Sequence, residues 1–178
     1  MSATAISETL FRSVVGLREY GFRGFLSVAR LRESLCVEVP VERGVYVVVR
    51  DTFLPPKFLE RSVGGRVRQV DPTVSVEVLS ARWVEGAMVL YIGRARGPGV
   101  RSLLQQRVKR YIRFGQGRAV AHYGGRFIWQ LRDHRALLLA WMPTPDEDPA
   151  AVDARLQSAF LASHGRLPFA NLKLESAE

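Results

Sequence analysis

The spacing of hydrophobic residues predicts a helix near the start of the chain and a buried strand after it. Within residues 6–18, leucine and valine recur at helical spacing, and Ser7 is a candidate N-cap. After Pro40, residues 44–50 form a run of valines and one tyrosine that is typical of a buried strand. The first segment that the pattern places in a sheet is therefore 44–50.

The middle of the chain predicts a long loop and then two more strands. Paired prolines and paired glycines interrupt residues 52–73, so no regular element is expected there. Val74, Val76 and Val78 alternate with polar residues, which favours a half-buried strand, and residues 88–92 predict another.

Beyond Gly93 the period becomes helical again. Residues 104–112 place apolar side chains on one face of an otherwise basic segment, which predicts an amphipathic helix with a cationic face. Residues 127–131 and 136–141 are apolar and predict a pair of strands.

The last helix has the clearest boundaries. Asp148 is a plausible N-cap, Pro149 occupies the first helical position, and Gly165 stands where a left-handed C-terminal residue belongs. Strands interspersed with helices predict an α/β domain.

Composition limits the class of protein. A chain of 178 residues fits one domain, and its single cysteine, Cys36, excludes an intramolecular disulfide. The longest apolar runs are far shorter than a membrane span, and no signal peptide is recognisable. These features predict a cytoplasmic protein without a membrane partner.

The charge is concentrated in one segment. Residues 94–135 hold eleven arginines and lysines against one acid, Asp133, whereas the rest of the chain is nearly neutral. Such a patch is typical of a protein that binds a polyanion, although a solvated surface would look the same. The basic residues expected to contact nucleic acid are Arg94, Arg96, Arg101, Lys109, Arg110, Arg113, Arg118 and Arg126.

Two tripeptides carry a resemblance to a known family. Gly-Val-Tyr at residues 44–46 and Tyr-Ile-Gly at 91–93 resemble the paired signature of the GIY-YIG nuclease domain. Leu104 stands three residues before Arg107, and Tyr111 follows one turn later, as in the helix that comes next in that family. A closing segment that ends at Asn171 also resembles the family, and counting back from it makes Asp153 the match of the family's glutamate.

The resemblance implies a fold, a reaction and a site. The fold would be a small, mostly antiparallel sheet flanked by helices, and the reaction a metal-dependent hydrolysis of DNA phosphodiesters. Asp153 would hold one divalent cation, Mg²⁺ or Mn²⁺. Tyr46 would orient or deprotonate the attacking water, which requires a nearby cation to lower its pKa. The candidate catalytic residues are Tyr46, Tyr91, Arg107, Tyr111, His122 and Asn171.

The chain departs from the family pattern in two respects. About forty residues separate Tyr46 from Tyr91, where the family has a short hairpin, so we expect an insertion at about 51–80. The expected organisation is a helical extension over 1–39 followed by the GIY-YIG-like domain over 40–178. In addition, Asp153 has a shorter side chain than the family's glutamate.

Each candidate residue also has a structural interpretation. The tyrosines could simply pack in the sheet, Arg107 could be a solvated cation, Asp153 could be a helix-start acid, and Asn171 could hold the terminal loop. Two further functions stay open: a binding module of the same fold without efficient catalysis, and a protein whose basic patch meets an acidic protein. The sequence does not distinguish DNA from RNA and leaves the oligomeric state open.

Overall fold

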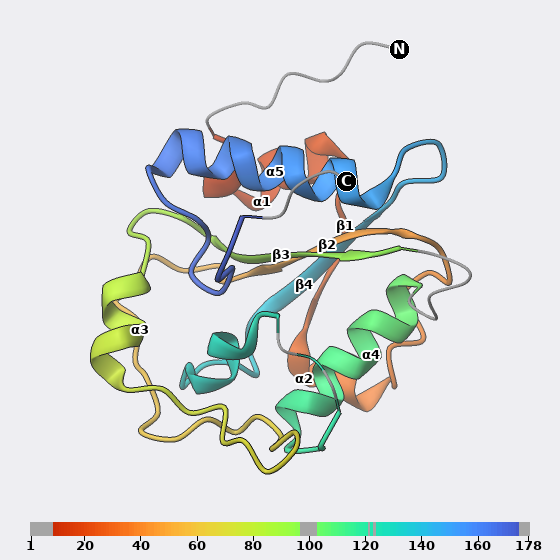
Figure 1. The fold of residues 1–178 in the computed structure, drawn as a ribbon. Coiled ribbons are helices and arrows are strands. Elements are labelled where there is room, and N and C mark those ends of the chain that lie inside the picture. The colour runs from red at the N-terminus through yellow and green to blue at the C-terminus, as the bar shows by residue number, and fades with distance from the viewer. Residues whose placement is uncertain (1–8, 97–102, 121, 123, 175–178) are drawn as a thin grey trace.

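A four-stranded antiparallel sheet forms the centre of the protein, seen here in a computed structural model that describes residues 9–96, 103–120, 122 and 124–174 (Figure 1). The strand order is β1-β4-β2-β3, so β3 is an edge strand. The strands are β1 (Arg23–Ser27), β2 (Gly44–Val49), β3 (Val89–Ala95) and β4 (Leu138–Pro143). This arrangement confirms an α/β fold with an antiparallel sheet flanked by helices.

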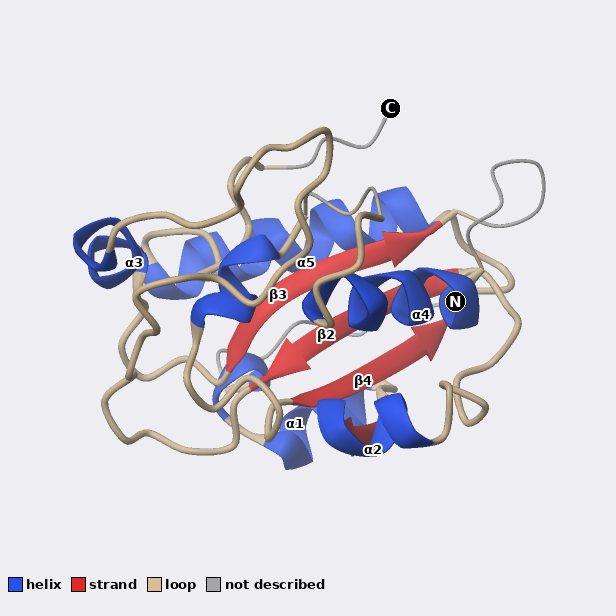
Figure 2. Ribbon diagram, turned by 90° about the horizontal axis from the view of Figure 1, so that it is seen from below, coloured by secondary structure: helices blue, strands red, loops and turns tan. Residues whose placement is uncertain are grey.

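Helices cover both faces of the sheet, as Figures 1 and 2 show. Leu17 of α1 and Leu156 of α5 belong to the core on one face, whereas Leu31 of α2 and Val108 of α4 belong to the core on the other. The helices are η1 (Leu10–Arg12), α1 (Val14–Tyr20), α2 (Val28–Glu33), α3 (Val76–Arg82), α4 (Leu104–Gly115), η2 (Arg126–Gln130) and α5 (Pro149–His164).

Several elements lie where the sequence predicts them. β2 is buried at all six positions, as its β-branched run indicates. In α5, the Asp148 side chain accepts a hydrogen bond from the Ala150 amide at 3.0 Å, and Gly165 is left-handed with φ 70°. Both ends of this helix are therefore capped as expected.

The strand predicted around Val74, Val76 and Val78 is wrong, because helix α3 occupies this segment. The Ser75 hydroxyl accepts a hydrogen bond from the Val78 amide at 3.4 Å and so caps the helix. Val76 and Val78 are 38% and 44% exposed, while Leu79 is fully buried. The capping hydrogen bond favours a helix, and this outweighs the strand preference of a short alternation of valines.

The strand predicted at 127–131 is also wrong, because the segment forms the 3-10 helix η2. Its apolar residues are buried all round, so no two-sided alternation marks the element. The buried Gln130 side chain accepts from the Val74 amide at 3.1 Å and donates to the carbonyls of Val74 and Leu59 at 2.7 and 2.9 Å. Gln130 thereby fastens the segment between β2 and β3 to the core.

The start of the chain differs from the single helix predicted over 6–18. Ser13, with φ −150°, separates η1 from α1 and caps α1 by accepting from the Gly16 amide at 2.9 Å; the candidate cap Ser7 lies outside the described residues. The segment 1–39 also contains β1 and α2, which the sequence pattern did not predict. β1 pairs with β4, so part of this segment completes the sheet.

Candidate functional site

Two neighbouring strands present tyrosines to the same core. Tyr46 of β2 lies opposite Gly93 of β3, and Tyr91 of β3 lies opposite Val48 of β2. Both tyrosines belong to the core that α4 covers. A Cβ atom at Gly93 would lie 2.6 Å from the Tyr46 ring, so this position must be glycine for the ring to pass over β3.

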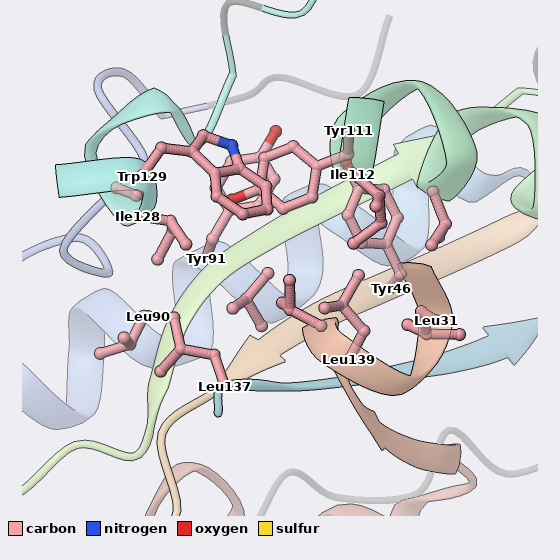
Figure 3. Close-up of a cluster of buried hydrophobic side chains, with 14 of the residues drawn as sticks. Leu31, Tyr46, Leu90, Tyr91, Tyr111, Ile112, Ile128, Trp129, Leu137 and Leu139 are labelled. Carbon is pink, nitrogen blue, oxygen red and sulfur yellow. The ribbon is translucent and has the colours of Figure 1, made fainter. Parts of the chain in front are cut away.

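Helix α4 adds a third tyrosine to this cluster. Figure 3 shows Tyr46, Tyr91 and Tyr111 between the sheet and the layer formed by α4 and η2. Their ring centroids are 5.9–6.3 Å apart, and Trp129 of η2 lies 4.9 Å from Tyr111. The Tyr111 hydroxyl donates to the Gly125 carbonyl at 3.0 Å. The three rings therefore form one packed unit drawn from three elements.

Two described residues that precede η2, His122 and Gly124, pack against the tyrosines. His122 is 2% exposed; its ring centroid lies 4.7 Å from that of Tyr111, and its Nε2 atom lies 3.5 Å from the Tyr46 hydroxyl. A Cβ atom at Gly124 would lie 2.4 Å from the Tyr91 hydroxyl. A glycine is required there because the backbone approaches the phenol so closely.

A cleft of about 600 Å³ opens beside this cluster, at the β3 edge. Tyr91 and Arg107 line it from the tyrosine side, and Asp153 lines it from α5. Because β3 is an edge strand, a residue of α5 can reach the same cleft as residues from the opposite face. The cleft also contains four further cations: Arg94, Arg96, Arg110 and Lys173.

Among the described residues that line the cleft, Asp153 is the one acidic side chain. Its Oδ2 atom accepts from Arg94 Nη1 at 3.1 Å, and its Oδ1 atom accepts from Gln157 Nε2 at 2.8 Å. The side chains of Arg94 and Asp153 are only 13% and 3% exposed. The sequence reasoning missed Gln157, although its position four residues after Asp153 places both on one helix face.

Burial keeps the phenols protonated. It raises the pKa of Tyr46, and the charge of Arg107 offsets only part of this effect. Burial also raises the pKa of Tyr91 and Tyr111 well above the usual value. The sequence reasoning required a cation to lower the pKa of Tyr46, and in this structure the net shift is upward. Tyr46 is therefore a neutral hydrogen-bonding group at neutral pH.

His122 is also neutral at physiological pH. Burial, with the charges of Arg107 and Arg110, lowers its pKa from 6.5 to about 3. A neutral imidazole has one nitrogen free to accept a hydrogen bond. His122 can thus accept from the Tyr46 hydroxyl and hold that phenol in place.

Asn171 holds the closing segment against the edge strand. Its Oδ1 atom accepts from the Ile92 amide at 2.9 Å, and its Nδ2 atom donates to the Ile92 carbonyl at 2.9 Å. On this side of β3, the Asn171 side chain thus makes the two backbone hydrogen bonds that a neighbouring strand would otherwise make. These contacts match the structural alternative for Asn171, and the residue also lines the cleft.

The other basic candidates divide into two groups around α4. Arg94, Arg96 and Arg110 line the cleft, as described above. A second pocket, of about 470 Å³, lies between α2 and α4 and is lined by Lys109, Arg113, Arg118 and a cation the sequence reasoning did not single out, Arg32. Arg126 lies over the Phe127 ring, 5.1 Å from its centroid, and lines neither pocket. Arg101 lies outside the described residues.

A metal ion held mainly by protein atoms does not fit this site. The described residues include no group of three or more His, Cys, Asp or Glu side chains placed to hold a metal. A single carboxylate does fit Mg²⁺ or Mn²⁺, because such ions keep several waters and also bind substrate phosphates.

Within the described part of the chain, no helix is long and apolar enough to cross a membrane.

Comparison with protein-family models, with curated proteins and with solved structures finds no match to this chain.

Proposed function

We propose that this protein is a divalent-cation-dependent endonuclease of the GIY-YIG type that hydrolyses phosphodiester bonds of DNA. The observation that carries the proposal is one juxtaposition: Tyr91, Arg107 and Asp153 come from β3, α4 and α5 and line a single cationic cleft. A sheet core would need the tyrosines alone, and a binding surface would need the cations alone. The combination supports chemistry on a phosphate.

Arg107 is the residue that would bind the scissile phosphate. Its guanidinium stays charged at any physiological pH and offers donors suited to a non-bridging phosphate oxygen. Its Nε atom is buried and has no hydrogen-bond partner among the described residues. Arg107 can therefore stabilise the charge that develops on the phosphate in the transition state.

Tyr91 is better placed than Tyr46 to contact the attacking water. Tyr91 lines the cleft, whereas Tyr46 is fully buried behind it. Both phenols are protonated, so Tyr91 would orient the water by hydrogen bonding rather than deprotonate it in the free protein. Tyr46, fixed by His122, would hold Tyr91 and Arg107 in position.

Asp153 is the residue that would hold the cation. It lines the cleft from α5, and its carboxylate is bonded there to Arg94 and Gln157. Mg²⁺ and Mn²⁺ are bound through one or two carboxylates together with waters and substrate phosphates. A bound Mg²⁺ or Mn²⁺ supplies Lewis-acid polarisation of the phosphate and lowers the pKa of a bound water.

Plasmid nicking in Mg²⁺ or Mn²⁺ tests the proposal. We expect Asp153→Ala to abolish nicking and Asp153→Glu to retain it, because glutamate keeps a carboxylate at the α5 position that lines the cleft. Arg107→Ala should lower the nicking rate by about 10²-fold or more, which is roughly the cost of removing one hydrogen-bond donor to the transition state. Arg113→Ala, on the same helix but outside the cleft, is the matched control and should still nick.

Two results would contradict the proposal. Cleavage by Asp153→Ala at the parent rate would show that this carboxylate is not the cation ligand. Equal loss in Arg107→Ala and Arg113→Ala would show that the helix contributes only general positive charge. Thermal unfolding of each variant must stay close to that of the parent for either result to count.

A binding module without catalysis is the second candidate function. The observation that favours it is the ion pair of Asp153 with Arg94, which engages the carboxylate that the described residues bring to the cleft. Such a protein would bind DNA with the same affinity in EDTA and in Mg²⁺ and would leave the plasmid intact in both.

A further inference from the structure

The ion pair between Arg94 and Asp153 joins the edge strand to helix α5 inside the cleft. Arg94 Nη1 lies 3.1 Å from Asp153 Oδ2, and both side chains are largely shielded from solvent, at 13% and 3% exposure. Gln157 occupies the other carboxylate oxygen at 2.8 Å. Both members of the pair line the cleft, so the contact sits where substrate would bind.

This pair opposes the binding of a cation to Asp153 in the free protein. A divalent ion beside the carboxylate would lie next to the Arg94 guanidinium, and like charges repel strongly where water is partly excluded. The charge of Arg107 also acts on Asp153, so two guanidinium groups already compensate one carboxylate. Cation and Arg94 therefore compete for the same acceptor.

A phosphate group in the cleft would remove this competition. A guanidinium can form two parallel hydrogen bonds to a phosphate, and Arg94 already lines the cleft that the phosphate would enter. When Arg94 turns from the carboxylate to the phosphate, its guanidinium no longer competes with a cation for the Asp153 oxygen. The added negative charge of the phosphate attracts that cation as well.

We propose that Arg94 couples cation binding to substrate binding: it holds Asp153 in the free protein and releases it to the cation when it binds a DNA phosphate. The inference rests on the proposed function, because it assumes that Asp153 is the cation ligand. It adds that the free protein binds Mn²⁺ weakly and that Mn²⁺ and DNA strengthen each other's binding. By linkage, the two ligands do so by the same factor.

The first measurement is the Mn²⁺ affinity of the full chain without DNA, followed by the signal of free Mn²⁺ in electron paramagnetic resonance. We expect Arg94→Gln to bind Mn²⁺ at least about five-fold more tightly than the parent, the lower end of typical coupling. Arg96→Gln is the matched control, because it removes the same charge from the same cleft and has no ion pair with Asp153 among those found in the described residues. Its Mn²⁺ affinity should rise by less than about two-fold.

The second measurement is the affinity for a short DNA duplex, by fluorescence anisotropy at constant ionic strength, with and without Mn²⁺. In the parent and in Arg96→Gln, Mn²⁺ should tighten DNA binding by at least about five-fold. In Arg94→Gln this enhancement should be lost. If Arg94 served only stability, Arg94→Gln would shift the thermal transition, and its affinities for Mn²⁺ and for DNA would equal those of Arg96→Gln.

The outcomes separate this inference from the proposed function. Equal Mn²⁺ affinities for Arg94→Gln and Arg96→Gln would overturn the coupling and leave Asp153 as cation ligand. Asp153→Asn should lose Mn²⁺ binding; if it binds as the parent does, the proposed cation site itself is wrong. If Arg94→Gln does not fold, Arg94→Met removes the charge and keeps an unbranched side chain, and it should bind Mn²⁺ more tightly than the parent; an unchanged affinity would again overturn the coupling.

Discussion

The imidazole of His122 packs beside Tyr111 and faces the Tyr46 hydroxyl, and its pKa of about 3 makes folding sensitive to pH. The unfolded chain gains a proton here near pH 6.5, and the folded protein does not until about pH 3. The neutral imidazole therefore contributes stability that is fully present above pH 6.5 and is lost as the pH falls from 6.5 toward about 3. At pH 5 the loss from this residue is about 2 kcal/mol.

Urea unfolding at neutral pH and at pH 5 measures this effect. Between neutral pH and pH 5, the free energy of unfolding should fall by about 2 kcal/mol less in His122→Asn than in the parent, whatever the stability of the variant at neutral pH. His164, whose lowered pKa accompanies only partial burial, provides a comparison, and His164→Asn should remove a smaller share. An identical pH dependence in the parent and in His122→Asn would show that the buried imidazole is protonated without cost.

At the scale of elements, the Asn171 side chain completes the edge of β3. Removing it in Asn171→Ala leaves the amide and the carbonyl of Ile92 without their partners in a buried place. Each of the two orphaned groups costs about 1–3 kcal/mol, so we expect the free energy of unfolding to fall by roughly 2–6 kcal/mol in urea unfolding. Leu172→Ala, next along the chain at a 39% exposed position, should cost less than about 1 kcal/mol. A similar cost for the two would contradict the edge role of Asn171.

Elements with a long, consistent period were predictable from the sequence. The run in β2, the amphipathic α4 and the capped α5 each repeat one signal over several positions. β1 was not predictable, because Gly24 and Phe25 have positive φ angles and the strand contains an irregularity in register. Its pairing depends on contact with Trp141, more than a hundred residues away, which local periodicity does not encode.

The candidate site divides in the same way. Motif order predicted one cleft for Tyr46, Tyr91, Arg107, Tyr111 and Asp153. Tyr91, Arg107 and Asp153 line one cleft, whereas Tyr46 and Tyr111 are fully buried in the core beside it. The partners that set their chemistry could not be predicted from the sequence: Arg94 lies 59 residues from Asp153, and His122 lies 76 residues from Tyr46. Sequence distance hides both.

At the scale of the whole molecule, the described basic residues of the segment 94–135 line pockets on two sides of α4 instead of forming one patch. Arg110 lines the cleft on one side of the helix, whereas Lys109 and Arg113 line the pocket on the α2 side. The opposite side of the sheet carries α1 and α5. DNA that enters the cleft would therefore meet positive charge across the exposed face of α4.

This distribution makes a prediction about salt. DNA binding should weaken steeply as salt rises, with a slope in log affinity against log salt of about −0.9 for each phosphate contacted on duplex DNA. Arg110→Glu with Arg113→Glu should lower affinity on any sequence and make the slope shallower by about two contacts. Arg12→Glu with Arg18→Glu makes the same change in net charge on η1 and α1, both elements of the other face, and should leave the slope unchanged. Because net charge is equal in the two double variants, any difference between them reports position alone. A flat titration of the parent, or equal slopes in both double variants, would remove α4 as the DNA-binding element.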